Sequence, residues 1–507
     1  MSDKDSAVGF GANAPFGLRA KNERPLMPWG GVASEATQSM STTGASARDR
    51  DSSESAHSFT GATHRRAAGD SPALPKGVVL ATAASGGSIA TTRYLGRAGL
   101  EVSVVSSPAL SPSAWSKHSF RSFSAPPESD TPRFLERLLA IGRMHPGQVL
   151  LATSDETAWL YTLHKDELSR YFIVNQPSLD TMKRLLDKRL FAEAITKAGL
   201  TNLPTWEPES LEHLKQLSST LPYPVLIKPR THVYRVENSK GVVVKSGEEL
   251  MREYEEFVER ESHHTRDSPM LPKARLPVLQ QFIDTAKRGV LSVSGYLSRR
   301  GDHFVTRRCV KVLQRSQPVG VGVCFEGMPA DPELSESVRA LCQELGYFGL
   351  FEVEFLQCEK GWAPIDFNGR IFNQIGLDIG RGMPLPLFAF LEATKQMSAL
   401  EEAVRKAQFY DQNDNTVFYD RFTLSATLAA RRLTGRISKD ELNRWRTWMR
   451  DHAGTSLDVA VEKSDWKPGL IHAVSEISLG LKAFPRFLKS IPRSTANRSQ
   501  LMAKAGL

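Results

Sequence analysis

The stretch GLFEVEFLQCEKGWAPIDFNGR, residues 349–370, contains two short apolar runs in which acidic residues occupy alternate positions. Side chains two apart along a strand lie on the same face, so Glu352 and Glu354 share one face of the first run. The turn-forming CEKG between the runs predicts a hairpin. If Glu354 pairs with Asp366, then Glu352 pairs with Asn368, and one face of the hairpin carries all four polar side chains while the other is apolar.

Carboxylate and amide oxygens gathered on one rigid face are the ligands that Mg²⁺ prefers. Arg370 follows directly, where a guanidinium could bind a phosphate through two hydrogen bonds. The alternative is an amphipathic hairpin whose acidic face is only solvated, because half-buried strands alternate in the same way. The hairpin alone leaves both interpretations open, and the sequence upstream decides between them.

Length and composition favour a multidomain protein of the cytoplasm. The chain has 507 residues, 40% of them hydrophobic, which is enough for more than one packed core. Its four cysteines have no CxxC spacing, which argues against a zinc site or a disulfide framework: Cys309, Cys324, Cys342 and Cys358. No N-terminal stretch has the apolar core of a signal peptide, and no apolar run approaches the roughly 20 residues that span a bilayer.

The net charge of +9 could indicate nucleic acid, anionic lipid or a polyanionic substrate. No RNP pattern or zinc finger accompanies the charge, so no nucleic-acid partner is expected. Residues 485–507 contain five basic and no acidic residues. We expect the amphipathic stretch 471–493 to pack on the body of the protein because Pro485 interrupts it, with peripheral contact to a membrane as the alternative.

The first 180 residues fall into two regions of different composition. Residues 1–76 are rich in Ser, Ala, Gly and Thr, which predicts a disordered tail; a transit peptide is the alternative, weakened by the mixed charges. Strand and helix patterns alternate over residues 77–180, which predicts a small parallel α/β domain. Its strand at 148–156 ends in a polar, acidic tip. Gly86 and Gly87 could hold a phosphate, but without GxGxxG a tight turn is the simpler interpretation.

Residues 181–395 combine many strands with interspersed helices, which is typical of an α+β domain. An amphipathic helix is expected over residues 178–200. Strands are expected at 222–230, 241–245, 277–284, 289–298 and 303–312, all ahead of the hairpin. A further helix begins near Pro386. From 396 to 507 the pattern is mostly helical and charged, which predicts a helical C-terminal extension.

The order of these elements resembles an ATP-grasp ligase of the carboxylate–amine type over roughly residues 77–395. By pattern, D-aspartate ligases, amino-acid ligases and the ATP-grasp domain of the carbamoyl-phosphate synthase large chain are similar. Five segments carry the resemblance: DKRLFAEAITKAGLTNLP (187–204), YPVLIKP (223–229), PVLQQFI (277–283), FEVEFL with PIDFNGR (351–370) and GLDIGRGMPLPLFAF (376–390). The resemblance implies an α+β ATP-grasp fold, in which two α/β lobes clasp ATP, after a small parallel α/β pre-ATP-grasp domain.

The resemblance also implies which residues bind the nucleotide. Lys188 and Lys228 would bracket the phosphates, since a lysine is a point charge that neutralises phosphate oxygens. Lys240 would add charge from the loop above them. Adenine would meet the backbone of the hinge between the lobes, at Gln281, Phe282 and Ile283.

The implied metal is Mg²⁺, with Mn²⁺ as a substitute. Glu354, Asp366 and Asn368 would hold it between the phosphates, and Glu352 is a second-choice ligand. Arg370 would steady the transferred phosphoryl group or an acyl phosphate.

Several positions depart from the family pattern. The second metal carboxylate is usually Glu and here is Asp366, and NGR replaces the usual NPR. The hinge has Gln280 and Gln281 where an acidic residue is common, and no carboxylate for the ribose is evident. The loop at 231–242 has one glycine, although glycines let backbone N–H groups approach phosphate. Arg235 and Lys240 would compensate with charge.

The reaction implied by the resemblance is ATP-dependent amide or peptide bond formation through an acyl phosphate, with release of ADP and phosphate. The expected partners are therefore a small-molecule carboxylate and an amine, and a homodimer is left open. One alternative is a carbamoyl-phosphate-synthase-like or biotin-carboxylase-like reaction with bicarbonate. Another is a nucleotide-binding module without turnover.

The residue that binds the carboxylate substrate is not determined by sequence. The candidates are four arginines near or before the hairpin: Arg307, Arg308, Arg315 and Arg381. His232 lies in the loop over the phosphates, and a surface histidine is the expected interpretation.

Overall fold

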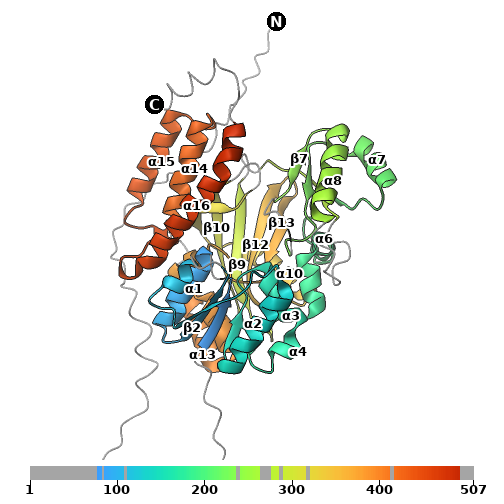
Figure 1. Ribbon diagram of the computed structural model, residues 1–507. Coiled ribbons are helices and arrows are strands. Elements are labelled where there is room, and N and C mark those ends of the chain that lie inside the picture. The colour runs from blue at the N-terminus through green and yellow to red at the C-terminus, as the bar shows by residue number, and fades with distance from the viewer. Residues whose placement is uncertain are drawn as a thin grey trace, which may run out of the picture.

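The structure is a computed structural model. It describes residues 77–82, 85–107, 111–233, 235, 240–262, 276–284, 289–315, 320–410 and 416–490, with only the backbone for 261–262 and 479–490. The predicted tail at 1–76 and the basic residues beyond 490 lie outside the described residues. Figure 1 shows the described elements as a lower body from which two groups of helices rise on either side of a large sheet.

The first sheet is parallel, as the sequence predicted, with strand order β3–β2–β1–β4. Its elements are β1 (Gly77–Ala81), α1 (Gly86–Arg97), β2 (Glu101–Ser106), η1 (Pro112–Trp115), β3 (Arg121–Ser124), α2 (Thr131–Met144), β4 (Val149–Leu151), α3 (Asp155–Leu163) and α4 (Lys165–Leu168). Every residue of β1 and β4 is buried, as expected for a parallel sheet covered on both faces. The strand order reverses between β1 and β4, and the loops after these two strands meet at the carboxyl edge, where such sheets bind ligands.

The second sheet is antiparallel, with strand order β5–β8–β6–β7. Its elements and the helices before and around it are α5 (Leu179–Leu186), α6 (Lys188–Lys197), β5 (Thr205–Trp206), α7 (Leu211–Thr220), β6 (Val225–Lys228), β7 (Val242–Val244), α8 (Gly247–Ser262) and β8 (Val278–Gln281). In Figure 1, α7 and α8 form the outer side of the lobe at upper right. The lobe has its own small core, built on residues such as Ile227, Leu250 and Leu279.

The single helix expected over 178–200 is wrong, because the chain forms two helices with Asp187 between them. Asp187 has an extended backbone, and its carboxylate accepts the N–H groups of Arg189 and Leu190 at 2.9 and 3.2 Å. It is therefore the N-cap of α6. The apolar periodicity runs on through the break, which is why the sequence pattern indicated one helix.

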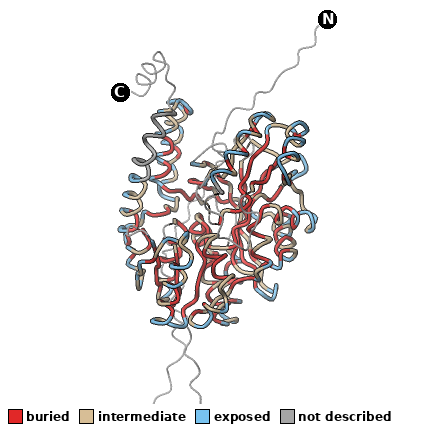
Figure 2. Tube along the Cα trace, turned by 45° about the vertical axis from the view of Figure 1, so that its right-hand side comes forward, coloured by how far each residue is buried: buried red, intermediate tan, exposed pale blue. Residues whose placement is uncertain are grey.

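The third sheet has seven strands in the order β13–β12–β9–β10–β11–β14–β15. Its elements before residue 410 are β9 (Val290–Leu297), β10 (Phe304–Gln314), β11 (Gly322–Met328), α10 (Pro332–Leu345), β12 (Gly349–Cys358), β13 (Gly361–Asn368), α11 (Ile375–Gly380), α12 (Leu385–Ala393) and α13 (Met397–Gln408). Figure 2 shows buried backbone concentrated in the interior of the molecule, with exposed residues at the tips of the rising helices. The central position of this sheet makes it the surface on which the site is built.

The C-terminal extension is helical, as expected, but it also completes the third sheet. Its elements are β14 (Val417–Tyr419), α14 (Arg421–Leu433), α15 (Lys439–Asp451), β15 (Leu457–Asp458), η2 (Lys463–Asp465) and α16 (Lys467–Ser490). The interruption expected at Pro485 is wrong, since α16 continues through it to Ser490. A proline removes one backbone hydrogen bond from a helix without forbidding its continuation.

Within the described part of the chain, no helix combines the length and the apolar composition needed to cross a bilayer.

Candidate active site

The hairpin pairs as the sequence predicted. β12 and β13 place Glu352 opposite Asn368 and Glu354 opposite Asp366. The register then shifts, because Phe355 pairs with Pro364 and Ile365 is passed over. Such a bulge leaves the extra residue outside the ladder. Its carbonyl is used elsewhere, since the ammonium of Lys228 donates to the Ile365 carbonyl at 2.8 Å.

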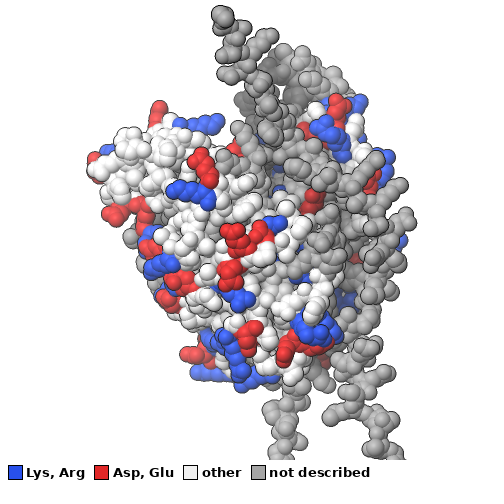
Figure 3. Space-filling view, turned by 180° about the vertical axis from the view of Figure 1, so that it is seen from behind, with Lys and Arg blue, Asp and Glu red and all other residues white. Residues whose placement is uncertain are grey.

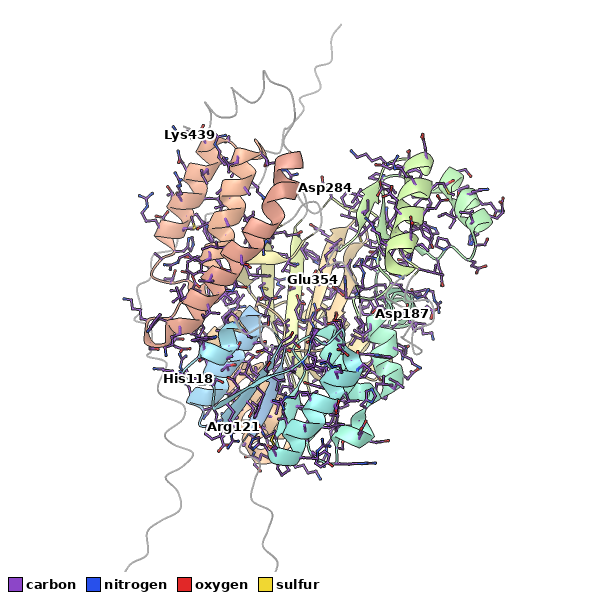
Figure 4. All side chains as sticks on the ribbon, viewed as in Figure 1. His118, Arg121, Asp187, Asp284, Glu354 and Lys439 are labelled. Carbon is purple, nitrogen blue, oxygen red and sulfur yellow. The ribbon has the colours of Figure 1, made fainter. Side chains whose placement is uncertain are left out.

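A pocket lies between this hairpin and the α7–α8 lobe, and we call it the hairpin pocket. Its walls come from β6, the following loop, β8, β10 and the hairpin, and its lining residues are Leu226, Lys228, His232, Lys240, Gln280, Gln281, Phe282, Ile283, Val290, Lys311, Gln314, Gly320, Glu354, Leu356, Ile365 and Asp366. Figure 4 shows Glu354 on the central sheet, between the α7–α8 lobe and the C-terminal helices. Seven of the predicted site residues therefore meet in one place: Lys228, Lys240, Gln281, Phe282, Ile283, Glu354 and Asp366.

Lys188 is buried and reaches the pocket through an ion pair with Asp366. Lys240 approaches the other oxygen of the same carboxylate, at 3.8 Å. Burial alone would raise the pKa of Asp366, but the charges of Lys188, Lys240 and Lys228 hold it well below its usual range. Asp366 is therefore ionised at neutral pH and anchors a cluster of cations.

Glu354 is paired with Lys311 of β10, whose ammonium lies 2.7 Å from the carboxylate. Burial opposes ionisation of Glu354, yet the nearby charges of Lys311 and Lys240 lower its pKa. Sequence reasoning missed Lys311. The signal for it was the strict alternation of β10, in which Lys311 shares a parity with the buried residues Val305 and Cys309.

Lys228 is the most perturbed cation of the pocket. Its side chain is only 8% exposed. Burial, followed by the charges of Lys188 and Lys240, lowers its pKa to about 7, against the opposing effect of Asp366 and Glu354. A neutral lysine that accepts a proton when an anion arrives is well suited to a phosphate site.

Arg230 connects the two lysine-bearing elements and was also missed from sequence. Its guanidinium binds Asp187 and Glu207, each at 2.6 Å. Its carbonyl accepts the backbone N–H of Lys188 at 2.8 Å. The end of β6 and the start of α6 are thus joined beside the pocket, which brings Lys188 and Lys228 together.

Asn368 and Arg370 are not among the residues that line the hairpin pocket; they lie further along the chain, toward the first sheet. The Asn368 amide donates to Glu352 at 2.5 Å, and its oxygen accepts from Arg370 at 2.8 Å. Arg370 also binds Asp155 of α3 at 2.8 Å. Glu352 is buried behind Asn368, and burial and the charge of Glu354 raise its pKa to about 7. It therefore orients Asn368 and does not face the pocket.

The N-terminal domain contributes an acidic group beside Arg370. The hydroxyl of Ser154 lies 3.4 Å from the Glu128 carboxylate. Burial and the charge of Glu156 raise the pKa of Glu128 to about 8. Burial and the neighbouring Asp155 raise the pKa of Glu156, while Arg370 opposes the shift. The acidic tip at 148–156 was noted in the sequence, but no role was assigned to it, and Glu128 was missed.

The first loop of the N-terminal domain packs directly on the segment after the hairpin. Gly86 and Gly87 begin α1 instead of forming a turn. A Cβ atom on Gly87 would lie 2.1 Å from the Phe372 carbonyl, and the Gly86 N–H donates to Asn373 at 3.1 Å. The glycines therefore permit close contact between domains, and that contact fixes Asp155 next to Arg370.

The arginines proposed for substrate binding are engaged elsewhere, and none lines the hairpin pocket. Arg307 and Arg381 are fully buried and donate to backbone carbonyls. Arg308 pairs with Asp331, and Arg315 pairs with Glu476 of α16. Expecting His232 at the surface is likewise wrong: it is half-buried in the pocket wall, where burial and neighbouring lysines lower its pKa.

The donor set fits Mg²⁺ in one specific way. Glu354 and Asp366 lie side by side in register, and their hard carboxylate oxygens suit the ion. No group of three or more His, Cys, Asp or Glu side chains in the described ranges could hold a metal by itself. Mg²⁺ usually takes one or two carboxylates together with substrate phosphates. Two carboxylates beside lysines fit an ion that arrives with a phosphate ligand.

Comparison with known proteins identifies the fold. No protein-family model matches the chain. It is 24% identical over 271 residues to a D-aspartate ligase of Enterococcus faecium, a match that covers 49% of this chain and 59% of the relative. The chain therefore spans less than two thirds of that curated relative.

Solved structures also resemble this chain. The biotin carboxylase of Campylobacter jejuni, solved as a β,γ-ATP complex, superimposes with a TM-score of 0.51 at 16% identity, covering 63% of this chain and 71% of the other. An L-amino acid ligase of Bacillus licheniformis has a TM-score of 0.48 at 15% identity, with 65% and 77% covered. The biotin carboxylase match and the architecture show an ATP-grasp fold, as the sequence motifs predicted.

Proposed function

We propose that this chain, which has the ATP-grasp fold, is an ADP-forming ligase that joins a carboxylate to an amine. The observation that carries the proposal is the meeting of Lys228, Lys240 and the ion-paired Lys188 with Glu354 and Asp366 around one pocket. These side chains come from both lobes and from separate parts of the sequence. A purely structural acidic hairpin would not require buried lysines from the opposite lobe.

The charges of the hairpin pocket suit a nucleoside triphosphate. Four lysines surround it, and the two ionised carboxylates do not balance them, so the pocket is net cationic: Lys188, Lys228, Lys240 and Lys311. Gln281, Phe282 and Ile283 form the opposite wall, where backbone groups would meet adenine. Glu354 and Asp366, with Asn368 next along the strand, would hold Mg²⁺. When bound, the ion would neutralise phosphate oxygens.

The chemistry requires positioning more than a nucleophilic side chain. A carboxylate oxygen of the first substrate attacks the γ-phosphoryl group, and ADP leaves. The product is an acyl phosphate, from which the amine then displaces phosphate to form an amide. Arg370 is held between Asn368 and Asp155, where its guanidinium would stabilise the charge on the phosphoryl group in transfer.

We assign the amine to the face of the N-terminal domain next to Arg370. Glu128 and Glu156 lie there, at the carboxyl edge of the parallel sheet. An ammonium group is attracted by adjacent carboxylates, and a carboxylate with a pKa of about 8 can also accept the proton that the amine loses on attack. Because the curated relative is named for ligating D-aspartate, we propose amino acids as substrates.

Phosphate and ADP release tests the function directly. Purified protein with MgATP is given pooled amino acids, then acids and amines separately, and the products are identified by mass spectrometry. We expect release of ADP and phosphate only when a carboxylate and an amine are both present. Turnover with bicarbonate alone would instead favour a carboxylase-like reaction, and nucleotide binding without turnover would favour a binding module. We place the reaction in the cytoplasm, which supplies ATP and keeps thiols such as Cys358 free.

A further inference from the structure

Helix α16, together with Trp466 directly before it, exposes a row of large apolar side chains on one face. Trp466, Leu470, Val474 and Ile477 are 59%, 52%, 42% and 63% exposed. Their spacing of four, four and three residues keeps them in one stripe along the helix. Single exposed apolar residues are normal on a protein surface, but a continuous stripe indicates an interaction surface.

The opposite face of α16 is fixed to the body, so the stripe has a defined orientation. His472 pairs with Asp420 at 2.6 Å, and Glu476 pairs with Arg315 at 2.9 Å. Pro468 and Gly469 are buried at the start of the helix. The stripe therefore faces away from the protein and is not a surface for packing against α14.

The sequence continues the same stripe and adds positive charge beside it. The period runs on through Leu481, Phe484 and Leu488 in the remaining turns of α16. In the sequence, three lysines each follow a residue of this period by one position. They are Lys467, Lys482 and Lys489.

This positive charge is unusual for the chain. After Glu476 the sequence contains six basic residues and no acidic residue: Lys482, Arg486, Lys489, Arg493, Arg498 and Lys504. On the face shown in Figure 3, by contrast, the described basic side chains are interspersed with acidic ones. The excess of positive charge therefore follows the apolar stripe directly in the sequence.

We propose that α16 docks on an anionic lipid surface, lying in the plane of the interface with its apolar stripe inserted. An amphipathic helix with a basic flank and aromatic and aliphatic residues on its buried face is the form that binds such surfaces. Anionic headgroups attract juxtaposed lysines and arginines. A lysine can lay its apolar stem along such a stripe while its ammonium group reaches the headgroups. This inference does not depend on the proposed ligase activity.

Two other occupants of the stripe match the charges less well. A second copy of the chain would bring two helices of the same positive sign together. Residues 1–76 carry nine basic and eight acidic residues, so they offer little net negative charge. An anionic lipid surface complements both the apolar stripe and the basic residues that follow it in the sequence.

The test is co-sedimentation of the full chain with vesicles of phosphatidylcholine alone or mixed with phosphatidylglycerol. We expect binding to the mixed vesicles, weakening as salt rises. The double variant Leu470→Glu, Ile477→Glu should abolish binding, because both side chains would enter the apolar layer. Lys482→Glu with Lys489→Glu should reduce binding at least 10-fold, as roughly expected for two reversed charges near such a surface. The matched control is Phe409→Glu, which changes a residue 79% exposed outside α16 and should bind like wild type.

Several outcomes would overturn the proposal. One is equal binding to neutral and anionic vesicles, and another is binding that survives Leu470→Glu with Ile477→Glu. Light scattering on the same proteins tests whether a second copy of the chain binds the stripe. A wild-type dimer that becomes a monomer in this double variant would show that the stripe binds a second copy and not lipid. Circular dichroism establishes that the variants keep their helix content, since both substituted positions are at the surface.

Discussion

At the scale of single residues, the cations of the hairpin pocket are held by the two carboxylates that we assign to the metal. Lys188 pairs with Asp366 and Lys311 with Glu354. With nucleotide and metal bound, phosphate oxygens would pair with the lysines and the metal would neutralise the carboxylates. The arrangement keeps buried charges compensated both before and after the nucleotide arrives.

Lys228 makes nucleotide binding dependent on pH. Its pKa of about 7 means that the free protein carries it mostly neutral at pH 8. Bound phosphates would raise that pKa, so binding takes up a proton and affinity falls as pH rises above about 7. Calorimetry at pH 8 in buffers of different ionisation enthalpy should show this uptake.

Lys228→Met should lose the proton uptake and weaken nucleotide binding about 10-fold or more, the loss expected for hydrogen bonds to a charged group. Lys215→Met, at an exposed position of α7, is the control and should match wild type. Unchanged proton uptake in the Lys228 variant would remove this lysine from the phosphate site.

Glu128 should determine the Michaelis constant for the amine. The Glu128 pKa is raised to about 8, so its carboxylate becomes more ionised as pH rises through that value. An ammonium substrate needs the ionised form, and its KM should therefore fall as pH rises toward 8. Glu128→Gln should raise the amine KM and flatten this profile, with the KM for ATP unchanged. Glu136→Gln, on the exposed side of α2, is the control; a Glu128 variant with the wild-type profile would refute the assignment.

At the scale of elements, the hairpin and the α5–α6 break build the site. The bulge omits Ile365 from the pairing with β12, and Lys228 binds the Ile365 carbonyl. A continuous helix over 178–200 would leave no cap at Asp187 to bind Arg230. Both irregularities place a lysine against the face that we assign to the metal, so they position the proposed site directly.

The assignment of Glu354 as a metal ligand is tested by separating the effect of its charge from its role in coordination. Glu354→Gln should lower turnover at least about 100-fold and also lower stability, because buried Lys311 loses its counter-ion. The double variant Glu354→Gln, Lys311→Met should recover much of the stability without recovering turnover. Electron paramagnetic resonance of Mn²⁺ with nucleotide should show weakened binding in both variants.

The control for the hairpin is Glu359→Gln, at the exposed turn of the same two strands. It removes a carboxylate of the same type outside the pocket and should leave stability, turnover and Mn²⁺ binding unchanged. Wild-type Mn²⁺ binding in the Glu354 variant would exclude that residue as a ligand.

Asp187→Ala should cost stability and nucleotide affinity together. It removes the cap of α6, worth about 1 kcal/mol, and leaves buried Arg230 with one carboxylate partner instead of two. We expect the free energy of unfolding in urea to fall by about 1–3 kcal/mol, and the KM for ATP to rise as Lys188 moves. Ser210→Ala removes the N-cap of α7, remote from the pocket. It should lower stability by about 1 kcal/mol without changing the KM, and equal KM changes in both would contradict a positioning role for Asp187.

The sequence predicted the elements with local periodicity and missed those decided by partners far along the chain. The alternation of β12 and β13 was enough to predict the pairing of Glu354 with Asp366. The bulge at Ile365 was not predicted, although Pro364, which lacks a backbone N–H, lies at the register shift, and prolines in strands favour edges and bulges. By contrast, nothing near Asp187 in the sequence indicated Arg230, 43 residues later, as its ion-pair partner.

At the scale of the whole molecule, the C-terminal extension is part of the folded body. β14 pairs with β11, and β15 pairs with β14, at the edge of the seven-stranded sheet. Arg93 of α1 binds Asp465 at 2.9 Å, and both side chains are buried. The extension therefore ties the first and third sheets together. Its strands are only two and three residues long, which explains why the sequence pattern of this region indicated helices alone.

Two truncated proteins test whether the C-terminal extension is a detachable tail or an integral part of the fold. A protein ending at Tyr410 would lack β14 and expose the core around Cys324 and Leu313, which Trp448 and Leu424 cover. We expect it to be insoluble or to unfold well below the full chain in thermal denaturation, because several large buried side chains would be lost. A protein ending at Ser478 keeps both strands and the ion pair between Arg93 and Asp465, and should match the full chain in melting temperature and ADP release. A folded and active protein ending at Tyr410 would show that the edge strands are dispensable, and that the ligase core ends before the extension.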